Sequence, residues 1–152
     1  MGTQAVWLVP QSFAWYQHNP PNSDRGRIPS QKDLESGRAP NQAEGRCMTY
    51  LGLVQGAKGL IYWCYYNMRV LPQYEEMWRW MKAIGAEVKE LSPTLLTAQD
   101  LGAVALDREI KDFYTMLRKE GDTCTLLAVN AGTATDRKST SLKSSHRIRS
   151  RM

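Results

Sequence analysis

Two apolar segments on either side of one helical segment constrain this fold more than any other feature of the sequence. Residues 5–9 read AVWLV, and Pro10, which has no amide proton to donate, ends the run. A second run, GLIYWC at 59–64, is rich in residues that favour strands. Continuous apolar runs are typical of strands buried on both faces, as in parallel sheets. We therefore predict two buried parallel strands joined through the helix between them.

That helix carries signals at both of its ends. Asn41 followed by Glu44 has the spacing of a capping box. Gly56 can adopt the left-handed conformation that often ends a helix. Between these ends, apolar side chains recur at helical spacing: Cys47, Tyr50, Leu51 and Val54. The prediction is a strand–helix–strand unit with a very short second connection.

A longer helix is predicted to follow, with Pro72 in its first turn and its end at Ser92-Pro93. Its apolar face is marked by residues at steps of three and four: Tyr74, Met77, Met81, Ile84, Val88 and Leu91. We expect part of the apolar surface around residues 77–81 to lack partners, so the chain could self-associate through it.

The pattern changes after this helix, and we place a domain boundary between residues 92 and 100. Short strands are predicted beyond it, at 101–106, 111–119 and 123–130. Glu120-Gly121-Asp122 is a plausible hairpin turn between the last two. Residues 131–152 hold almost nothing apolar, so we expect a disordered tail.

The net charge of +5 is confined to that tail. Residues 136–152 carry six basic side chains and one acid, so the preceding 135 residues, with 14 of each sign, are neutral. The tail lacks interleaved aromatic residues and any known nucleic-acid-binding module. Nucleic acid is therefore not the partner we expect.

Cysteine and histidine content excludes other classes of site. Three cysteines and two histidines, far apart in the sequence, provide neither a disulfide framework nor metal-ligand spacing. No cofactor motif is present. No apolar run approaches the roughly 20 residues of a membrane helix, so no membrane association is expected.

Three sequence segments resemble a known family. RAP at 38–40, EGRCMTY at 44–50 and GAKGLIYW at 56–63 are similar to the last two βα units of (β/α)8-barrel glycoside hydrolases. In those proteins the eighth strand often ends in an aromatic residue that stacks on a sugar. The later segment LLAVN at 126–130 resembles a strand of the β-sandwich that often follows the barrel.

The resemblance implies an α/β fold that is part of a TIM barrel. Residues 5–10 would be barrel strand seven and residues 59–64 strand eight, with a few antiparallel strands and a disordered basic tail behind them. A whole barrel needs about 250 residues, so the chain would be a fragment. Its parts would be 1–94 from the barrel, 95–130 from the start of a β-sandwich domain, and 131–152 as the tail.

Four residues are the substrate-binding candidates, because barrel active sites lie at the carboxyl ends of the strands. They are Gln11 and Phe13 after the first strand, and Trp63 and Tyr65 at the end of the second. Trp63 is the leading candidate, since an indole can pack on the C–H face of a sugar and donate its N–H. In the alternative interpretation, Trp63 is a large residue packed inside the barrel.

No catalytic residue is proposed. Glycoside hydrolysis needs two carboxyl groups, and in the largest clan of these barrels one is a glutamate at the end of strand seven. Gln11 stands there, and its amide can bind a hydroxyl but cannot act as a nucleophile. Asp24, Asp33 and Glu35 lie in a polar loop where acids are usually solvated, and His18 has no triad pattern.

Two functions remain open at this stage. The chain could belong to a glycoside hydrolase-like protein that cleaves O-glycosyl bonds with carboxylates outside this sequence, contributing only sugar-binding aromatic residues and being inactive alone. It could instead be a non-catalytic carbohydrate-binding relative, or a truncated product without function. The expected partner is an oligo- or polysaccharide.

Overall fold

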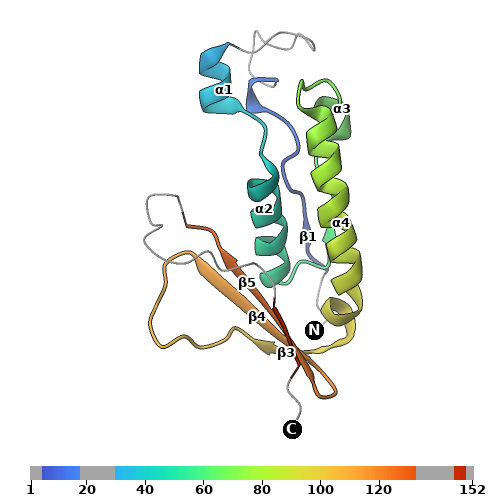
Figure 1. The fold of residues 1–152 in the computed structure, drawn as a ribbon, viewed down its shortest axis with the longest axis vertical. Coiled ribbons are helices and arrows are strands. Elements are labelled where there is room, and N and C mark those ends of the chain that lie inside the picture. Colours follow the sequence, from blue (N-terminus) through green and yellow to red (C-terminus); the bar gives the residue numbers. More distant parts are fainter. Residues whose placement is uncertain (1–4, 18–29, 133–145, 150–152) are drawn as a thin grey trace.

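A computed structural model describes residues 5–17, 30–132 and 146–149. Two small sheets and four α-helices make up this part of the chain (Figure 1). In chain order the elements are β1 (Trp7–Leu8), the 3-10 helix η1 (Trp15–Gln17), α1 (Gln31–Gly37), α2 (Gln42–Val54), β2 (Gly59–Leu60), α3 (Tyr65–Met68), α4 (Tyr74–Thr97), β3 (Gln99–Gly102), β4 (Phe113–Glu120), β5 (Thr123–Asn130) and β6 (His146–Arg149).

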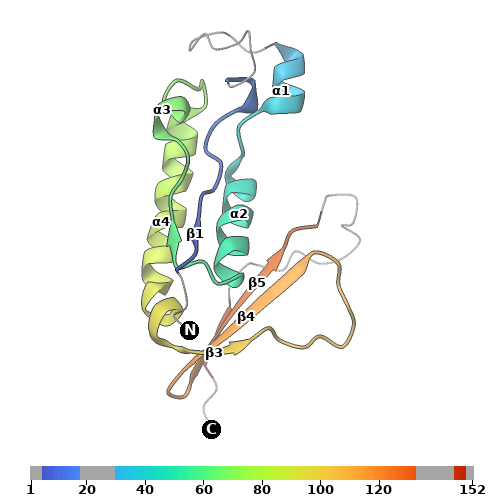
Figure 2. The same cartoon turned by 180° about the vertical axis from the view of Figure 1, so that it is seen from behind.

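The elements form an elongated helical part with an antiparallel sheet at one end. Helices α2 and α4 run along the long axis with β1 beside them, and β3, β4 and β5 cross their lower ends (Figures 1 and 2). Strands β1 and β2 pair in parallel, with Trp7 opposite Gly59 and Leu8 opposite Leu60. The antiparallel sheet has the order β3-β4-β5-β6.

The predicted signals at both ends of α2 are confirmed. The Asn41 side chain accepts a hydrogen bond from the Glu44 amide at 3.0 Å, and Glu44 accepts one from the Asn41 amide at 2.9 Å. Gly56 follows the helix with a φ of +90°. The hairpin at Gly121 between β4 and β5 is confirmed as well, again with positive φ.

Two glycines let α2 approach its neighbours closely. A Cβ on Gly45 would overlap the ring of Trp80 on α4, and one on Gly52 would overlap the side chain of Leu8 on β1. The Trp80 ring in turn meets Tyr62 edge to face, with centroids 6.3 Å apart. Close helix packing here therefore depends on the absence of two methyl groups.

The predicted end of α4 at Ser92-Pro93 is wrong, because the helix continues through Pro93 to Thr97. Proline removes one backbone hydrogen bond from a helix. In this turn the Ser92 hydroxyl donates to the Val88 carbonyl at 2.8 Å. Leu95, beyond the proline, is buried in a hydrophobic cluster, so tertiary packing outweighs the local signal.

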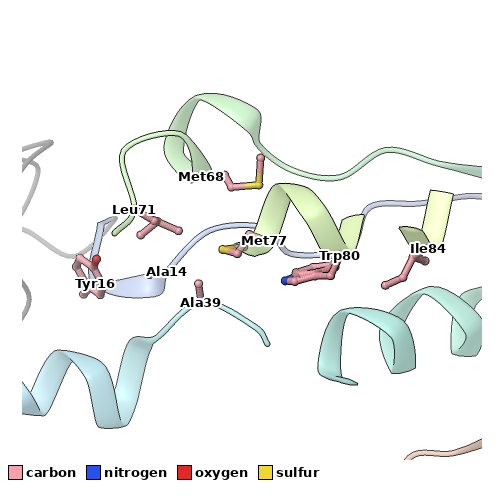
Figure 3. Packing of buried hydrophobic residues seen from close by; sticks show 8 residues of the cluster. All are labelled: Ala14, Tyr16, Ala39, Met68, Leu71, Met77, Trp80 and Ile84. Atoms are coloured by element: carbon pink, nitrogen blue, oxygen red, sulfur yellow. The ribbon is translucent and has the colours of Figure 1, made fainter. Parts of the chain in front are cut away.

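One hydrophobic cluster lies towards the end of the molecule that holds η1 and α3 (Figure 3). It contains Ala14, Tyr16, Ala39, Met68, Leu71, Met77, Trp80 and Ile84. Met77 and Trp80 are almost fully buried, so the expectation that the apolar surface around 77–81 lacks partners is wrong for these two side chains. Side chains from segments before α2, such as Ala39, and after it, such as Met68, pack around them.

A second cluster joins the helices to the antiparallel sheet. It contains Tyr50 and Leu53 of α2, Leu95 of α4, and Met116, Leu127 and Val129 of the sheet. Helix α4 crosses the predicted boundary at 94/95, and residues on both sides of that boundary share this cluster. The buried face of the sheet contacts helices.

The expected partial TIM barrel is wrong. A barrel closes through eight parallel strands, whereas the described residues hold one parallel pair, and every other strand is antiparallel. The chain forms a small mixed α/β fold in which α2 and α4 pack against both the parallel pair and the antiparallel sheet. The predicted strand–helix–strand unit is present, but its sequence pattern does not determine how many further strands join the sheet.

A short strand lies within residues 131–152, the segment that the sequence predicts to be disordered. Residues 146–149 form β6, which pairs antiparallel with β5. The sequence of this strand is HRIR, and its isoleucine is a residue that favours strands. The polar composition of residues 131–152 as a whole nevertheless predicts disorder. The rest of the predicted tail after Gly132 lies outside the described residues.

Candidate functional site

The carboxyl ends of the two parallel segments lie side by side, so the residues predicted to bind substrate come from neighbouring segments. Gln11 and Trp63 are bridge partners beyond β1 and β2. The Trp63 amide donates to the Pro10 carbonyl at 3.0 Å, and the Ser12 amide donates to the Trp63 carbonyl at 2.7 Å. The backbone thus positions Trp63 firmly, next to the segment that holds Gln11 and Phe13.

Two of the four predicted substrate-binding residues are engaged inside the protein. The Gln11 amide donates to the Phe13 carbonyl at 2.7 Å. Phe13 is only 8% exposed and packs edge to face with Trp15, with ring centroids 5.0 Å apart. Both side chains therefore shape the turn into η1; Phe13 is buried, whereas Gln11 is partly exposed but uses its amide N–H within the turn.

Tyr65 is half exposed, but its ring belongs to an aromatic group at the start of α4. It meets Tyr74 and Trp78 edge to face, at centroid distances of 6.3 and 5.8 Å. The neighbouring Tyr66 is also half exposed, with the Arg69 guanidinium 5.9 Å from its ring centre. These contacts orient both tyrosines.

Trp63 is the predicted residue with the largest free surface, and it belongs to an exposed apolar face. In the observed register, Trp7 and Val9 lie on the same side of the pair as Ile61 and Trp63. Their exposed fractions are 58%, 54%, 50% and 56%, respectively. We call these four residues the exposed face.

The opposite face of the pair is covered by helices. Leu8 packs on Gly52 of α2, and Leu60 packs against the second cluster. The Tyr62 hydroxyl lies 2.5 Å from the Thr49 hydroxyl of α2. The prediction that both strands are buried on both faces is therefore wrong, because helices cover one face only.

Trp7 lies across the pair, over β2. A Cβ on Gly59 would be 2.6 Å from ring atoms of Trp7, so the indole lies against the Gly59 backbone. Along residues 59–63, the exposed face is then an aromatic ring over Gly59, an aliphatic side chain at Ile61 and a second ring at Trp63. Four residues of strand span about 13 Å.

Trp7, Val9 and Ile61 were missed as site residues because the sequence suggested that they were buried. The alternation of side chains between the two faces of a strand could have indicated their exposure. Once Trp7 is placed opposite Gly59, every second residue of both segments falls on one face. Gly59, the one residue in its segment without a side chain, marks where a ring could lie across the strands.

The described carboxylates with charged partners act in helix and sheet contacts away from this face. Glu87 of α4 forms an ion pair with Arg46 of α2 and accepts a hydrogen bond from Tyr50 at 2.8 Å. Burial, assisted by that hydrogen bond, raises the pKa of Tyr50 to about 12. The Arg46 guanidinium also lies 4.8 Å from the Tyr50 ring centre, so the three residues tie α2 to α4.

Three further acids have structural partners. Glu44 accepts a short hydrogen bond from Arg38, which lowers the pKa of the carboxyl, and it also completes the cap of α2. Asp100 pairs with the buried Arg118 at 3.1 Å. Glu35 accepts from Gln31 within α1. His18 and Asp24 lie outside the described residues.

The described ranges, 5–17, 30–132 and 146–149, contain neither a cluster of metal-binding side chains nor a helix that could span a membrane. No group of three or more histidine, cysteine, aspartate or glutamate side chains there is arranged to hold a metal ion. Every helix in those ranges is too short or too polar to cross a membrane.

Comparisons with known proteins give no relative. No family, curated protein or solved structure matches this chain.

Proposed function

We propose that this protein binds carbohydrate, without cleaving it, through the exposed face of Trp7, Val9, Ile61 and Trp63. The observation that carries the proposal is the pair of half-exposed indoles on one face, one of them lying across Gly59. The C–H faces of sugars pack on such rings, and the indole N–H can donate to a hydroxyl. Of the earlier resemblance to glycoside hydrolases, we retain only this class of ligand.

The length of the face favours a chain of sugars over a single ring. One ring lies over Gly59 and the other belongs to Trp63, four residues further along the segment, so each can contact a different sugar with Ile61 between them. The aliphatic side chains exclude water from the contact but cannot select hydroxyl groups. The ligand that fits best is therefore an extended, neutral oligosaccharide.

Binding without cleavage follows from the residue types. The exposed face and the neighbouring Gln11 contain no carboxyl group, and hydrolysis of a glycosidic bond normally needs two. Gln11 also uses its amide N–H within the turn.

Calorimetric titration with a panel of neutral oligosaccharides tests the proposal. Trp63→Ala and Trp7→Ala should each weaken binding about tenfold, which corresponds to about 1.4 kcal/mol of lost contact. Trp78→Ala is the matched control, because Trp78 is partly exposed on α4, which packs against the covered face. Its affinity should equal that of the unmodified protein.

Two results would contradict the proposal. The first is that no oligosaccharide binds at millimolar concentration. The second is that Trp7→Ala and Trp63→Ala leave sugar binding unchanged while shifting the sedimentation coefficient from dimer to monomer. The second result would make the exposed face a protein–protein interface, which is the other common role of apolar surface patches.

A further inference from the structure

A separate groove lies between α4, β2 and the carboxyl end of α2. Its volume is about 530 Å³, within the range of sites that hold small ligands. Leu53 of α2, Leu60 of β2 and Leu95 of α4 contribute to its apolar wall. It lies on the helix-covered side of the parallel pair and is distinct from the exposed face.

The charges around this groove have one sign. Lys58, Lys82 and Lys89 line it, and no carboxylate does. In the described part of the chain, none of these three lysines has a carboxylate within ion-pair distance. Lys82 and Lys89 are seven residues apart and lie on the same side of α4. An apolar groove with a positive rim is complementary to an apolar ligand that carries a negative charge.

Gly85 opens the groove in the middle of α4. A Cβ at this position would have no atom within 4 Å, so the absence of a side chain leaves free space. Gly85 lies between Lys82 and Lys89 and lines the groove with them. Glycine destabilises a helix relative to alanine, and no close packing requires it here.

We propose that this groove binds the alkyl chain of a free long-chain carboxylate, with its carboxylate held at the lysine rim. The apolar walls provide burial for the chain, and each CH₂ removed from water adds to the affinity. The lysines provide charge complementarity for the carboxylate. A cationic amphiphile of the same length would meet three like charges. This proposal does not depend on the carbohydrate proposal, because none of the four residues of the exposed face lines the groove.

Titration with sodium dodecanoate, kept below its micelle concentration, tests the groove. We expect saturable binding of one molecule per chain, at least tenfold tighter than that of dodecyltrimethylammonium. Gly85→Leu should weaken dodecanoate binding at least tenfold by filling the groove. It should not lower the melting temperature, since leucine favours helix over glycine and a Cβ at this position has no atom within 4 Å.

Charge variants distinguish binding through the lysine rim from non-specific hydrophobic binding. The double variant Lys82→Met/Lys89→Met should weaken dodecanoate binding threefold to tenfold at low salt, and less at high salt because charges are screened. Lys119→Met on β4, an exposed lysine outside the groove, is the matched control and should bind as the unmodified protein does.

Three outcomes would overturn the proposal. One is the absence of saturable dodecanoate binding. Another is equal binding of the cationic amphiphile. The third is that Gly85→Leu binds normally while Trp7→Ala does not, which would assign the alkyl chain to the exposed face. Sugar titrations of Gly85→Leu keep the two proposals apart, because that variant should bind oligosaccharide normally.

Discussion

The same substitution at two glycines should change stability in opposite directions. Alanine replaces glycine in a helix with a gain of about 1 kcal/mol when nothing else changes. At Gly85 the new methyl group has no atom within 4 Å, so Gly85→Ala should stabilise the protein by about that amount. At Gly45 the methyl group would overlap two atoms of the Trp80 ring.

The cost at Gly45 follows from the surroundings of Trp80. The ring is rigid, only 3% exposed, and packed against Tyr62, so it cannot turn away. Overpacking typically costs about 1–3 kcal/mol, and the rigid ring places this site in the upper part of that range. After subtraction of the helix gain, Gly45→Ala should destabilise by about 1–2 kcal/mol.

Urea denaturation followed by far-ultraviolet circular dichroism measures both variants. The gap between them should be about 2–3 kcal/mol, or roughly 5–10 °C in melting temperature for a chain of this size. Trp80→Phe combined with Gly45→Ala should lose less than the two single changes added together, because a smaller ring leaves space for the methyl group. Equal stability of Gly45→Ala and Gly85→Ala would refute the close approach of α2 and α4.

Two further predictions concern α2. Asn41→Ala removes the cap and should destabilise by about 1 kcal/mol in the same urea assay, whereas Asn41→Ser should retain most of that stability. Tyr50 has a raised pKa, so its contribution to stability is complete below pH 10 and is lost as the pH rises towards about 12. Tyr50→Phe should flatten that part of the curve of unfolding free energy against pH; an unchanged slope would contradict the raised pKa of Tyr50, which burial causes with the help of the Glu87 hydrogen bond.

Features set by neighbours in the sequence could be predicted. The Asn41 cap, the left-handed Gly56 and the hairpin at Gly121 each depend on a few consecutive residues whose backbone preferences agree. The parallel pairing of β1 and β2 also followed, because a helix between two strands returns the chain in the same direction. These signals are local, and the structure retains them.

Features that depend on which side chains are buried by distant parts of the chain could not be predicted. An apolar run such as 5–9 does not reveal that helices cover Leu8 and leave Trp7 exposed. Pro93 indicates the end of a helix, yet burial of Leu95 extends α4 beyond it. For the same reason, Phe13 could be expected near the candidate site but not shown to be buried.

The groove could not be anticipated either. Its walls come from α2, β2 and α4, and its space depends on Gly85, which in sequence is only a weak point in a helix. The three lysines that line it are separated by up to 31 positions along the chain, counted from Lys58 to Lys89. Only the folded chain brings them to one rim.

The position of Val88 has a consequence for how the protein unfolds. This residue of α4 packs against both hydrophobic clusters, the one near η1 and α3 and the one beneath the antiparallel sheet. Loss of either cluster removes cover from the same side chain and weakens the other. The two ends of the molecule are therefore coupled through one helix, so unfolding of one end should destabilise the other.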